Sequence, residues 1–378
     1  LVVFDEMHLY IGAQAVNMGK SKSLTATLAC IKSLLRAGVP IVVSTATLPT
    51  EFKSTIINEL VNAGLEDAIE EITPSDADRK FVDRKLTVST YTGDVGELVQ
   101  EVGRGKRTLV VLNTVGGAAR FYNDSREKVS DIILLHSRMI EKERSSRLDR
   151  ISRMNDEFLV VATQVVEAGV DLSFDILVTE TAPPDSLLQR AGRVARRGGE
   201  GEIYVLPLSD GGARVYGEWL PRETFKQLQV SPSLDNSLLT IYDEVIEKNE
   251  VDLVDLPYRN ILNAIDEYPS HSLEFAKKVW DIVCGFVREG EQVAAIPRIY
   301  LDSMLKERQM SGWSFCIDDE LFRSLHSQGR ILKAIREDQK LTELRKIPPH
   351  TCISEQFFRD NIIAVIIEDY DEEVGLTA

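Results

Sequence analysis

Arginines crowd into one short stretch, residues 189–198, which reads Gln-Arg-Ala-Gly-Arg-Val-Ala-Arg-Arg-Gly. The Pro-Pro-Asp-Ser sequence at residues 183–186 predicts the start of a helix just before it. Continued helical spacing would place Arg190, Arg193 and Arg197 near one face, and no acidic residue lies within the stretch to pair with them. We therefore expect an anion here, and a nucleoside triphosphate fits best because arginines stabilise charge on a transferring phosphoryl group. The alternative is a basic, solvated helix face.

Two adjacent acids, Asp5 and Glu6, directly follow the apolar residues 1–4. A run of this kind predicts a buried parallel strand, and ligands of open α/β sheets bind at the carboxyl ends of strands. One carboxylate there can hold Mg²⁺, and the next can orient or deprotonate an attacking water. The alternative is an ordinary exit from a strand into a loop, but the arginine stretch favours a nucleotide site.

The elements that must position these residues alternate between strands and helices, which predicts an α/β fold with parallel sheets. Helices are expected at residues 21–36 and after Pro49, and strands at residues 1–4, 40–44, 85–91, 108–112, 132–135, 158–162, 176–180 and 202–206. Beyond residue 206 the alternation is lost. There, residues 235–251 and 272–289 predict amphipathic helices, and residues 361–368 an apolar strand or a buried helix.

Four motifs, in order along the chain, resemble those of superfamily 2 helicases. Asp5-Glu6-Met7-His8 resembles the DExH box, Thr45-Ala46-Thr47 the Ser-Ala-Thr motif, residues 160–171 the motif that contacts both DNA and nucleotide, and residues 189–196 the last motif, QRxGRxxR. The amino-acid sequences of four segments are similar to those of the helicase of CRISPR type I interference. The segments are residues 112–115, 134–138, 163–171 and 182–190.

The resemblance covers residues 1–206 and implies two RecA-like α/β domains. We expect residues 1–88 to be the C-terminal part of the first RecA-like domain, which is incomplete. Residues 89–206 would be the second, and residues 207–378 a mixed, mainly helical accessory domain.

The resemblance also implies a site for ATP and Mg²⁺. It assigns Asp5 to the metal ion and Glu6 to the catalytic base, and it places His8 between the nucleotide and the other domain. Arg193 and Arg196 would be arginine fingers that reach the γ-phosphate.

Further residues of the same motifs would support the nucleotide site. Gln189 would lie near the DExH box, Asp171 would accept a hydrogen bond from the ribose, and Gly169 would let the backbone approach closely. Thr45 and Thr47 would couple hydrolysis to domain motion, although plain N-capping of the following helix is the alternative for both, and the two roles are compatible.

Short polar residues at the ends of strands in the second α/β domain form a second candidate site. Such groups can bond successive phosphates of a single nucleic-acid strand. For each of them, capping and turn chemistry is an equal alternative. The residues are Asn113, Thr114, His136, Ser137 and Thr163.

Two motifs of related enzymes are not found in these residues. The phosphate-binding pattern G-x-x-x-x-G-K-[ST] is missing, because Gly19-Lys20-Ser21 follows the acidic box and has Gln14 where the first glycine is required. We therefore expect a fragment that does not hydrolyse ATP by itself. No His-Asp dipeptide occurs either. The metal-dependent nuclease often joined to such helicases is thus expected upstream or on a separate subunit.

The net charge of −16 is unevenly spread. Residues 1–205 carry 25 basic and 29 acidic side chains, whereas residues 206–378 have a net charge of −12. A nearly neutral helicase part with clustered arginines suits a local track for phosphates. The four cysteines lack C-x-x-C spacing, which indicates a reducing, cytoplasmic setting and not a zinc site. No apolar run approaches the ~18 residues of a membrane span.

The function implied by the resemblance is ATP-dependent translocation along single-stranded DNA, which unwinds target DNA in CRISPR type I interference. A crRNA-guided interference complex would be the partner. The alternatives are another superfamily 2 helicase, acting in DNA repair, and a catalytically incomplete DNA-binding scaffold.

Overall fold

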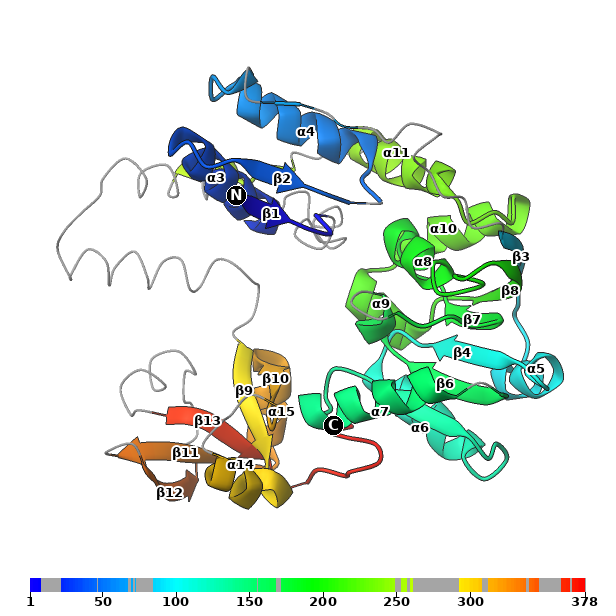
Figure 1. Cartoon of the computed structure of the whole chain (residues 1–378), viewed down its shortest axis with the longest axis vertical. Coiled ribbons are helices and arrows are strands. Elements are labelled where there is room, and N and C mark those ends of the chain that lie inside the picture. Colours follow the sequence, from blue (N-terminus) through cyan, green and yellow to red (C-terminus); the bar gives the residue numbers. More distant parts are fainter. Residues whose placement is uncertain are drawn as a thin grey trace. The chain divides into compact units, whose positions relative to one another are not determined.

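The computed structural model describes residues 1–7, 22–45, 47–66, 69–70, 72, 84–154, 156–167, 171–248, 253–256, 259–260, 292–307, 312–337, 340–346, 362–367 and 369–377. The fold is α/β, and its largest element is a six-stranded parallel sheet with the order β3-β8-β7-β4-β6-β5 (Figure 1). Its strands are β3 (Arg84–Thr90), β4 (Arg107–Val111), β5 (Ile132–Leu135), β6 (Phe158–Ala162), β7 (Ile176–Glu180) and β8 (Gly199–Leu206). The six strands predicted in these places are confirmed.

The central strands form because their residues are mainly apolar, with Thr108, Thr179 and Glu180 as buried polar exceptions. All five residues of β6 and of β7 are buried, as are the last four of β4. Continuous burial is the mark of a parallel strand that is covered on both faces. The helical elements that connect the strands are α5 (Val95–Val102), α6 (Val115–Ser125), α7 (Glu141–Arg153), the 3₁₀ turn η2 (Gln164–Val166) and α8 (Pro184–Ala191).

The chain divides into two compact units, and neither is one continuous stretch. The first consists of residues 1–92 and 180–289, and the second of residues 93–179 and 290–378. The domain boundaries expected at residues 88 and 206 therefore stay a prediction. Among the described residues, none of the helices is both long and apolar enough to cross a membrane.

The N-terminal part of the first unit confirms the strands and helices expected before residue 62, but the strand at residues 2–4 is not buried as expected, since Val3 is 56% exposed. Strands β1 (Val2–Phe4) and β2 (Ile41–Val43) pair in parallel, and α3 (Lys22–Arg36) and α4 (Thr50–Val61) are the helices. Leu24, Leu28 and Ile31 of α3 are buried, at the spacing of one helix face. Phe52 of α4 packs edge-on against the ring of Tyr242, with the ring centroids 5.8 Å apart.

The C-terminal part of the first unit is helical. It contains α9 (Asp210–Tyr216), α10 (Trp219–Val230), η3 (Asn236–Leu239) and α11 (Thr240–Lys248). The last two confirm the helix expected over residues 235–251. The helix expected at 272–289 lies outside the described residues.

The mixed, mainly helical character expected for residues 207–378 is found in residues 210–248 but not in the described residues after 291. A five-stranded mixed sheet lies there, in the order β10-β9-β13-β11-β12, with two short helices and a 3₁₀ turn. The strands are β9 (Gln292–Pro297), β10 (Phe315–Asp318), β11 (Ile331–Glu337), β12 (Lys340–Lys346) and β13 (Ile362–Ile367), and the helical elements are η4 (Arg298–Tyr300), α14 (Leu301–Glu307) and α15 (Asp319–Ser327).

Strand β11 lies in the part of the chain that was expected to be mainly helical. Arg330, Lys333 and Arg336 have helical spacing, yet residues 331–337 pair on both sides, with β12 and with β13. Two ladders of backbone hydrogen bonds outweigh a weak local propensity. Arg330 instead pairs with Asp369, its Nε lying 2.8 Å from Oδ2. The apolar residues 362–367 do form a strand, which confirms one of the two alternatives.

The arginine stretch is also not one helix. Helix α8 ends at Ala191, Gly192 follows as its C-cap, and Ala195 has a φ of +46°. A non-glycine residue in this left-handed region cannot continue a helix. The expectation that Arg190, Arg193 and Arg197 share a helix face is therefore wrong.

Arg190 is a buried structural arginine. It is fully inaccessible to solvent, and its guanidinium donates to the carbonyl oxygen of Glu180 (2.9 Å) and to the hydroxyl of Tyr216 (3.2 Å). These contacts hold α8 to the end of β7 and to α9. The guanidinium is thus engaged by protein acceptors, which makes this residue part of the fold.

We expect Arg190→Ala to lower the free energy of unfolding by about 3–5 kcal/mol, because it leaves a cavity and two buried acceptors without their donor. Arg196→Ala, at an exposed position of the same stretch, is the control and should change stability by less than about 1 kcal/mol. Urea denaturation of both variants tests this. Equal losses would contradict a structural role specific to Arg190.

Candidate nucleotide and nucleic-acid site

The acidic loop after β1 is held by Ser44, which follows β2. Ser44 donates its backbone N–H to the carbonyl of Phe4 (2.9 Å), and Met7 donates to the carbonyl of Ser44 (3.0 Å). The Ser44 hydroxyl donates to Oδ1 of Asp5 (2.5 Å). Glu6 lies between these contacts with a φ of +53°, in a region that costs a non-glycine residue of order 1–3 kcal/mol. The loop is thus fixed at both ends around a strained glutamate.

This loop fits a hard cation. Ser44 orients Asp5 through one carboxylate oxygen and leaves the other for a metal ion, and Asp5 is exposed. Within the described ranges, no group of three His, Cys, Asp or Glu residues encloses a possible metal position. That absence is compatible with Mg²⁺, which is commonly held by one or two carboxylates together with phosphates and water. His8 lies outside the described residues.

Thr45 and Thr47 do not cap the helix that follows them. The N-cap of α4 is Pro49, without any side-chain hydrogen bond, so the capping alternative is wrong. Instead, Thr47 donates its backbone N–H to the hydroxyl of Thr45 (3.3 Å). The Thr47 side chain is buried, and its hydroxyl has no hydrogen-bond partner among the described residues. A buried unpaired hydroxyl is costly, which is consistent with a role outside the static fold.

The two predicted arginine fingers differ in exposure. Arg193 is only 8% exposed, and its backbone N–H donates to the carbonyl of Arg190 (3.0 Å). Arg196 is exposed, in the turn that contains Ala195. Gln189 lies in the last turn of α8. Of the two arginines, Arg196 is the better placed to reach a ligand.

The residues predicted to contact nucleic acid come together at one edge of the sheet. Strands β4, β6 and β5 are neighbours, and Ala162 is the register partner of both Val111 and Leu135. The three strands therefore end level with one another, within the roughly 5 Å spacing of adjacent strands. The residues that follow these ends are Asn113, Thr114, His136, Ser137 and Thr163.

Backbone contacts connect the three strand ends. Leu112 donates to the carbonyl of Ala162 (3.0 Å), and Thr163 donates to the carbonyl of Leu135 (3.1 Å). The side-chain amide of Gln164 donates to the carbonyl of Asn113 (2.9 Å). These bonds fix Asn113 and Thr163 relative to each other, and both are buried.

Thr114 also serves the fold, because its hydroxyl accepts the backbone N–H of Gly117 (3.1 Å) as the N-cap of α6. The capping alternative is therefore confirmed for this residue, although its half-buried side chain does not exclude a ligand contact. Ser137 is exposed, and so is Asp171. Gly169 lies outside the described residues.

His136 is enclosed by the protein. The backbone N–H of Arg138 donates to its Nδ1 (3.1 Å), so the ring carries its proton on Nε2 and donates it to the carbonyl of Val374 (2.8 Å). The side chain is fully buried, and burial lowers the pKa of His136 from 6.5 to about 4. In this conformation neither ring nitrogen is left for a phosphate.

The residues that enclose His136 were not found from the sequence. They belong to residues 369–377, which we call the C-terminal strap. The role of these residues depends on their contact with a distant part of the chain, and a local sequence pattern does not predict such a contact. Arg190 was visible in the motif, but its burial could not be inferred from spacing.

Part of the chain matches a known protein family. Residues 104–199 match the family model described as "CRISPR-associated nuclease/helicase Cas3, C-terminal". A putative CRISPR-associated nuclease/helicase Cas3 of Methanocaldococcus jannaschii is 27% identical over 245 residues, which cover 56% of this chain and 31% of that protein. The chain carries a Cas3-type helicase region.

Solved structures show the same fold. A crystal structure of T. fusca Cas3 with ATP matches with a TM-score of 0.51 at 19% identity, over 78% of this chain and 42% of that one. A CRISPR RNA-guided surveillance complex in a pre-nicking state contains a chain that matches with a TM-score of 0.54 at 18% identity, over 99% of this chain and 54% of that one. The chain thus spans under two thirds of each of these relatives. Roles of individual residues stay proposals.

The burial of His136 predicts a pH dependence of stability. Because the pKa is lower in the folded than in the unfolded chain, the unfolded chain binds more protons between pH 6.5 and about 4. This stabilisation is complete above pH 6.5 and is lost as the pH falls toward 4. Between pH 7 and 5 we expect His136 to account for roughly 2 kcal/mol of the fall in the free energy of unfolding.

Urea denaturation of the wild type and of His136→Gln at both pH values measures this contribution. The variant should show a flatter pH dependence, whereas the control His326→Gln, at a partly exposed position, should follow the wild type. An unchanged slope in His136→Gln would contradict the prediction.

Proposed function

We propose that this chain is the motor part of an ATP-dependent helicase that moves along single-stranded DNA and unwinds target DNA in CRISPR type I interference. The observation that carries the proposal is the level ending of β4, β6 and β5, which gathers polar residues at one sheet edge. The acidic loop held by Ser44 supports a nucleotide site. The Cas3-type sequence of residues 104–199 supports the CRISPR context.

The proposed nucleotide chemistry uses the two carboxylates of the acidic loop, those of Asp5 and Glu6. ATP with Mg²⁺, when bound, would supply the phosphoanhydride bond whose hydrolysis drives movement. Asp5 would hold Mg²⁺ through the carboxylate that Ser44 orients. Glu6 would accept the proton of the attacking water, and its strained backbone would keep the carboxylate in place. His8 would contact the nucleotide from the same loop.

Residues of the second and last motifs would complete this site. Arg196, which is exposed, would stabilise charge on the γ-phosphate, with Arg193 and Gln189 close to it in the chain. Asp171 and Gly169 would receive the ribose side of the nucleotide. Thr45 and Thr47 would couple hydrolysis to domain motion, and the unpaired hydroxyl of Thr47 supports such a role.

The proposed contacts with DNA are polar and mostly uncharged. Hydroxyl and amide groups of Asn113, Thr114, Ser137 and Thr163 would bond phosphate oxygens of one strand. Phosphate contacts position a strand without reading its bases, which suits a motor that must pass over any sequence. A crRNA-guided interference complex would load the motor. A metal-dependent nuclease, encoded upstream or on a separate subunit, would cut the strand.

Glu6→Gln should abolish ATP turnover in the whole protein while ATP affinity changes little. The amide is nearly isosteric with the carboxylate but cannot accept the proton of water. Steady-state ATPase assays and nucleotide titrations measure the two effects. A variant that keeps most of its kcat would show that Glu6 is not the base.

Arg196→Ala should lower the kcat for ATP by roughly 10³-fold, the loss typical of a missing arginine finger. Arg197→Ala is the matched control, because Arg197 is the exposed neighbour outside the motif, and its kcat should stay near that of the wild type. Single-turnover ATP hydrolysis by the whole protein makes the comparison. Loss of DNA affinity alone in Arg196→Ala would assign this arginine to DNA and not to the nucleotide.

A further inference from the structure

The C-terminal strap is a compact turn. Oδ1 of Asp371 accepts the backbone N–H groups of Glu373 and Val374, both at 2.8 Å, and Gly375 donates to the carbonyl of Asp371 at 2.8 Å. Gly375 has a φ of +66°, a conformation that favours glycine. The strap therefore has a defined shape of its own.

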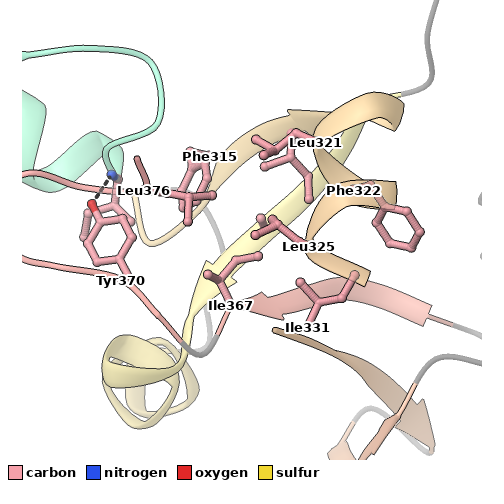
Figure 2. Packing of buried hydrophobic residues seen from close by; sticks show 11 residues of the cluster. Phe315, Leu321, Phe322, Leu325, Ile331, Ile367, Tyr370 and Leu376 are labelled. Atoms are coloured by element: carbon pink, nitrogen blue, oxygen red, sulfur yellow. Dashed lines mark hydrogen bonds between the residues drawn. The ribbon is translucent and has the colours of Figure 1, made fainter. Parts of the chain in front are cut away.

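This turn is bonded to the loop after β5, residues 136–140. The carbonyl of Val374 accepts the ring N–H of His136, and Leu376 donates to the carbonyl of Arg138 (3.1 Å). The hydroxyl of Tyr370 accepts the backbone N–H of Ile140 (3.0 Å), a bond drawn in Figure 2. The loop is thus tied to the strap at its first, third and last residues.

Close packing accompanies these hydrogen bonds. A Cβ atom on Gly375 would lie 2.7 Å from Cε1 of His136 and 2.8 Å from the carbonyl oxygen of Arg138. Leu376 and Met139 are fully buried. Figure 2 shows Leu376 and Tyr370 in the apolar cluster of the five-stranded sheet, which fixes the strap from its other side.

Glu143 of α7 also forms a hydrogen bond to the strap. Its Oε2 accepts the hydroxyl of Tyr370 (2.6 Å), and its Oε1 accepts the hydroxyl of Tyr300. Arg147, one turn later, donates to the carbonyls of Leu134 (2.8 Å) and Glu372 (2.6 Å), so it joins β5 to the strap directly. Ser137 is the exposed residue of the loop so held.

We propose that the C-terminal strap positions the single-strand site: it fixes residues 136–140 so that Ser137 stands at the sheet edge, and His136 is the anchor of the strap and not a phosphate ligand. This inference rests on the proposed function, and it replaces the DNA contact assigned to His136. A loop that is already ordered binds its ligand more tightly, because binding then costs no further conformational entropy for ordering the loop. The competing model is that the strap covers the site and DNA must displace it.

Tyr370→Phe tests the positioning model with a one-atom change. The variant loses the acceptor of the Ile140 N–H and leaves that buried donor unpaired. Tyr300→Phe is the matched control, since it also loses a hydrogen bond to Glu143 but its hydroxyl has no bond to the loop. We expect Tyr370→Phe to weaken binding of a fluorescein-labelled oligo-deoxythymidine roughly fivefold or more, and Tyr300→Phe to leave it nearly unchanged.

Gly375→Ala provides a second, steric test. The added methyl group meets His136 and Arg138 and should weaken oligo-deoxythymidine binding roughly tenfold. Gly105→Ala is its control, because Gly105 has a φ of +67° but an added Cβ there would meet nothing within 4 Å. Backbone strain is therefore equal in the two variants, and only one disturbs the loop.

Binding is measured by anisotropy at a temperature where circular dichroism shows every variant folded, and hydrogen exchange of the Ile140 amide reports on the loop. Faster exchange together with weaker binding in Tyr370→Phe and Gly375→Ala supports positioning. Tighter binding in these variants would mean that the strap competes with DNA, and unchanged binding would mean that the loop needs no support; either overturns the inference alone. Absence of binding by the wild type would overturn the proposed function and this inference with it.

Discussion

Parallel pairing of three neighbouring strands in one register is the constraint on which the candidate site depends. The last three residues of β4, the last three of β5 and all five of β6 are apolar and buried. Leu135, Ala162 and Val111 share one level of the sheet, so the chain becomes polar on all three strands at the same place. A slip of one residue would exchange the faces of every side chain and would also break this alignment.

The three strand ends are stabilised in different ways. After β4, the chain enters α6 at once, and Thr114 caps the helix from within the same segment. After β6, the turn η2 follows, and Gln164 ties it back to Asn113. After β5, residues 136–140 lead to α7, whose N-cap Ile140 makes no side-chain hydrogen bond. The support that is missing locally comes from the strap, more than 200 residues later in the chain.

Much of the α/β part could be predicted because its signals are local. The strand Phe158–Ala162 is an uninterrupted apolar run and Ile176–Glu180 begins with one, and the structure places both at the residues expected. The grouping of Asn113, His136 and Thr163 at one edge followed from the rule that parallel strands end together. The solvent exposure of these three residues could not be predicted in this way, because burial depends on which other parts of the chain pack against the strand ends. His136 is the clearest case, since its enclosure depends on Val374 and Gly375.

Other expectations failed where long-range pairing outweighed local spacing. Residues 331–337 lie in a part expected to be mainly helical but form a strand between two others. The arginines after Ala191 lie outside α8, which ends at that residue, and the left-handed conformation of Ala195 turns the backbone further. In both places the sequence pattern was real, but several conformations are compatible with it, and tertiary contacts selected a different one.

The composition of the second unit from residues 93–179 and 290–378 has a consequence for the order of folding. On the ribosome, β5 and α7 emerge long before Tyr370 and Val374, so the carbonyl that accepts the His136 proton is not yet available. Joining the two stretches closes a loop of more than 100 residues, and contacts of such sequence separation form late and slowly. Until then Met139 and Ile140 remain uncovered, and a nascent chain with exposed apolar groups is a substrate for chaperones and a risk for aggregation. The last hydrogen bonds to form would be those that shape the loop after β5, so the residues proposed to contact DNA would be among the last to reach their final positions.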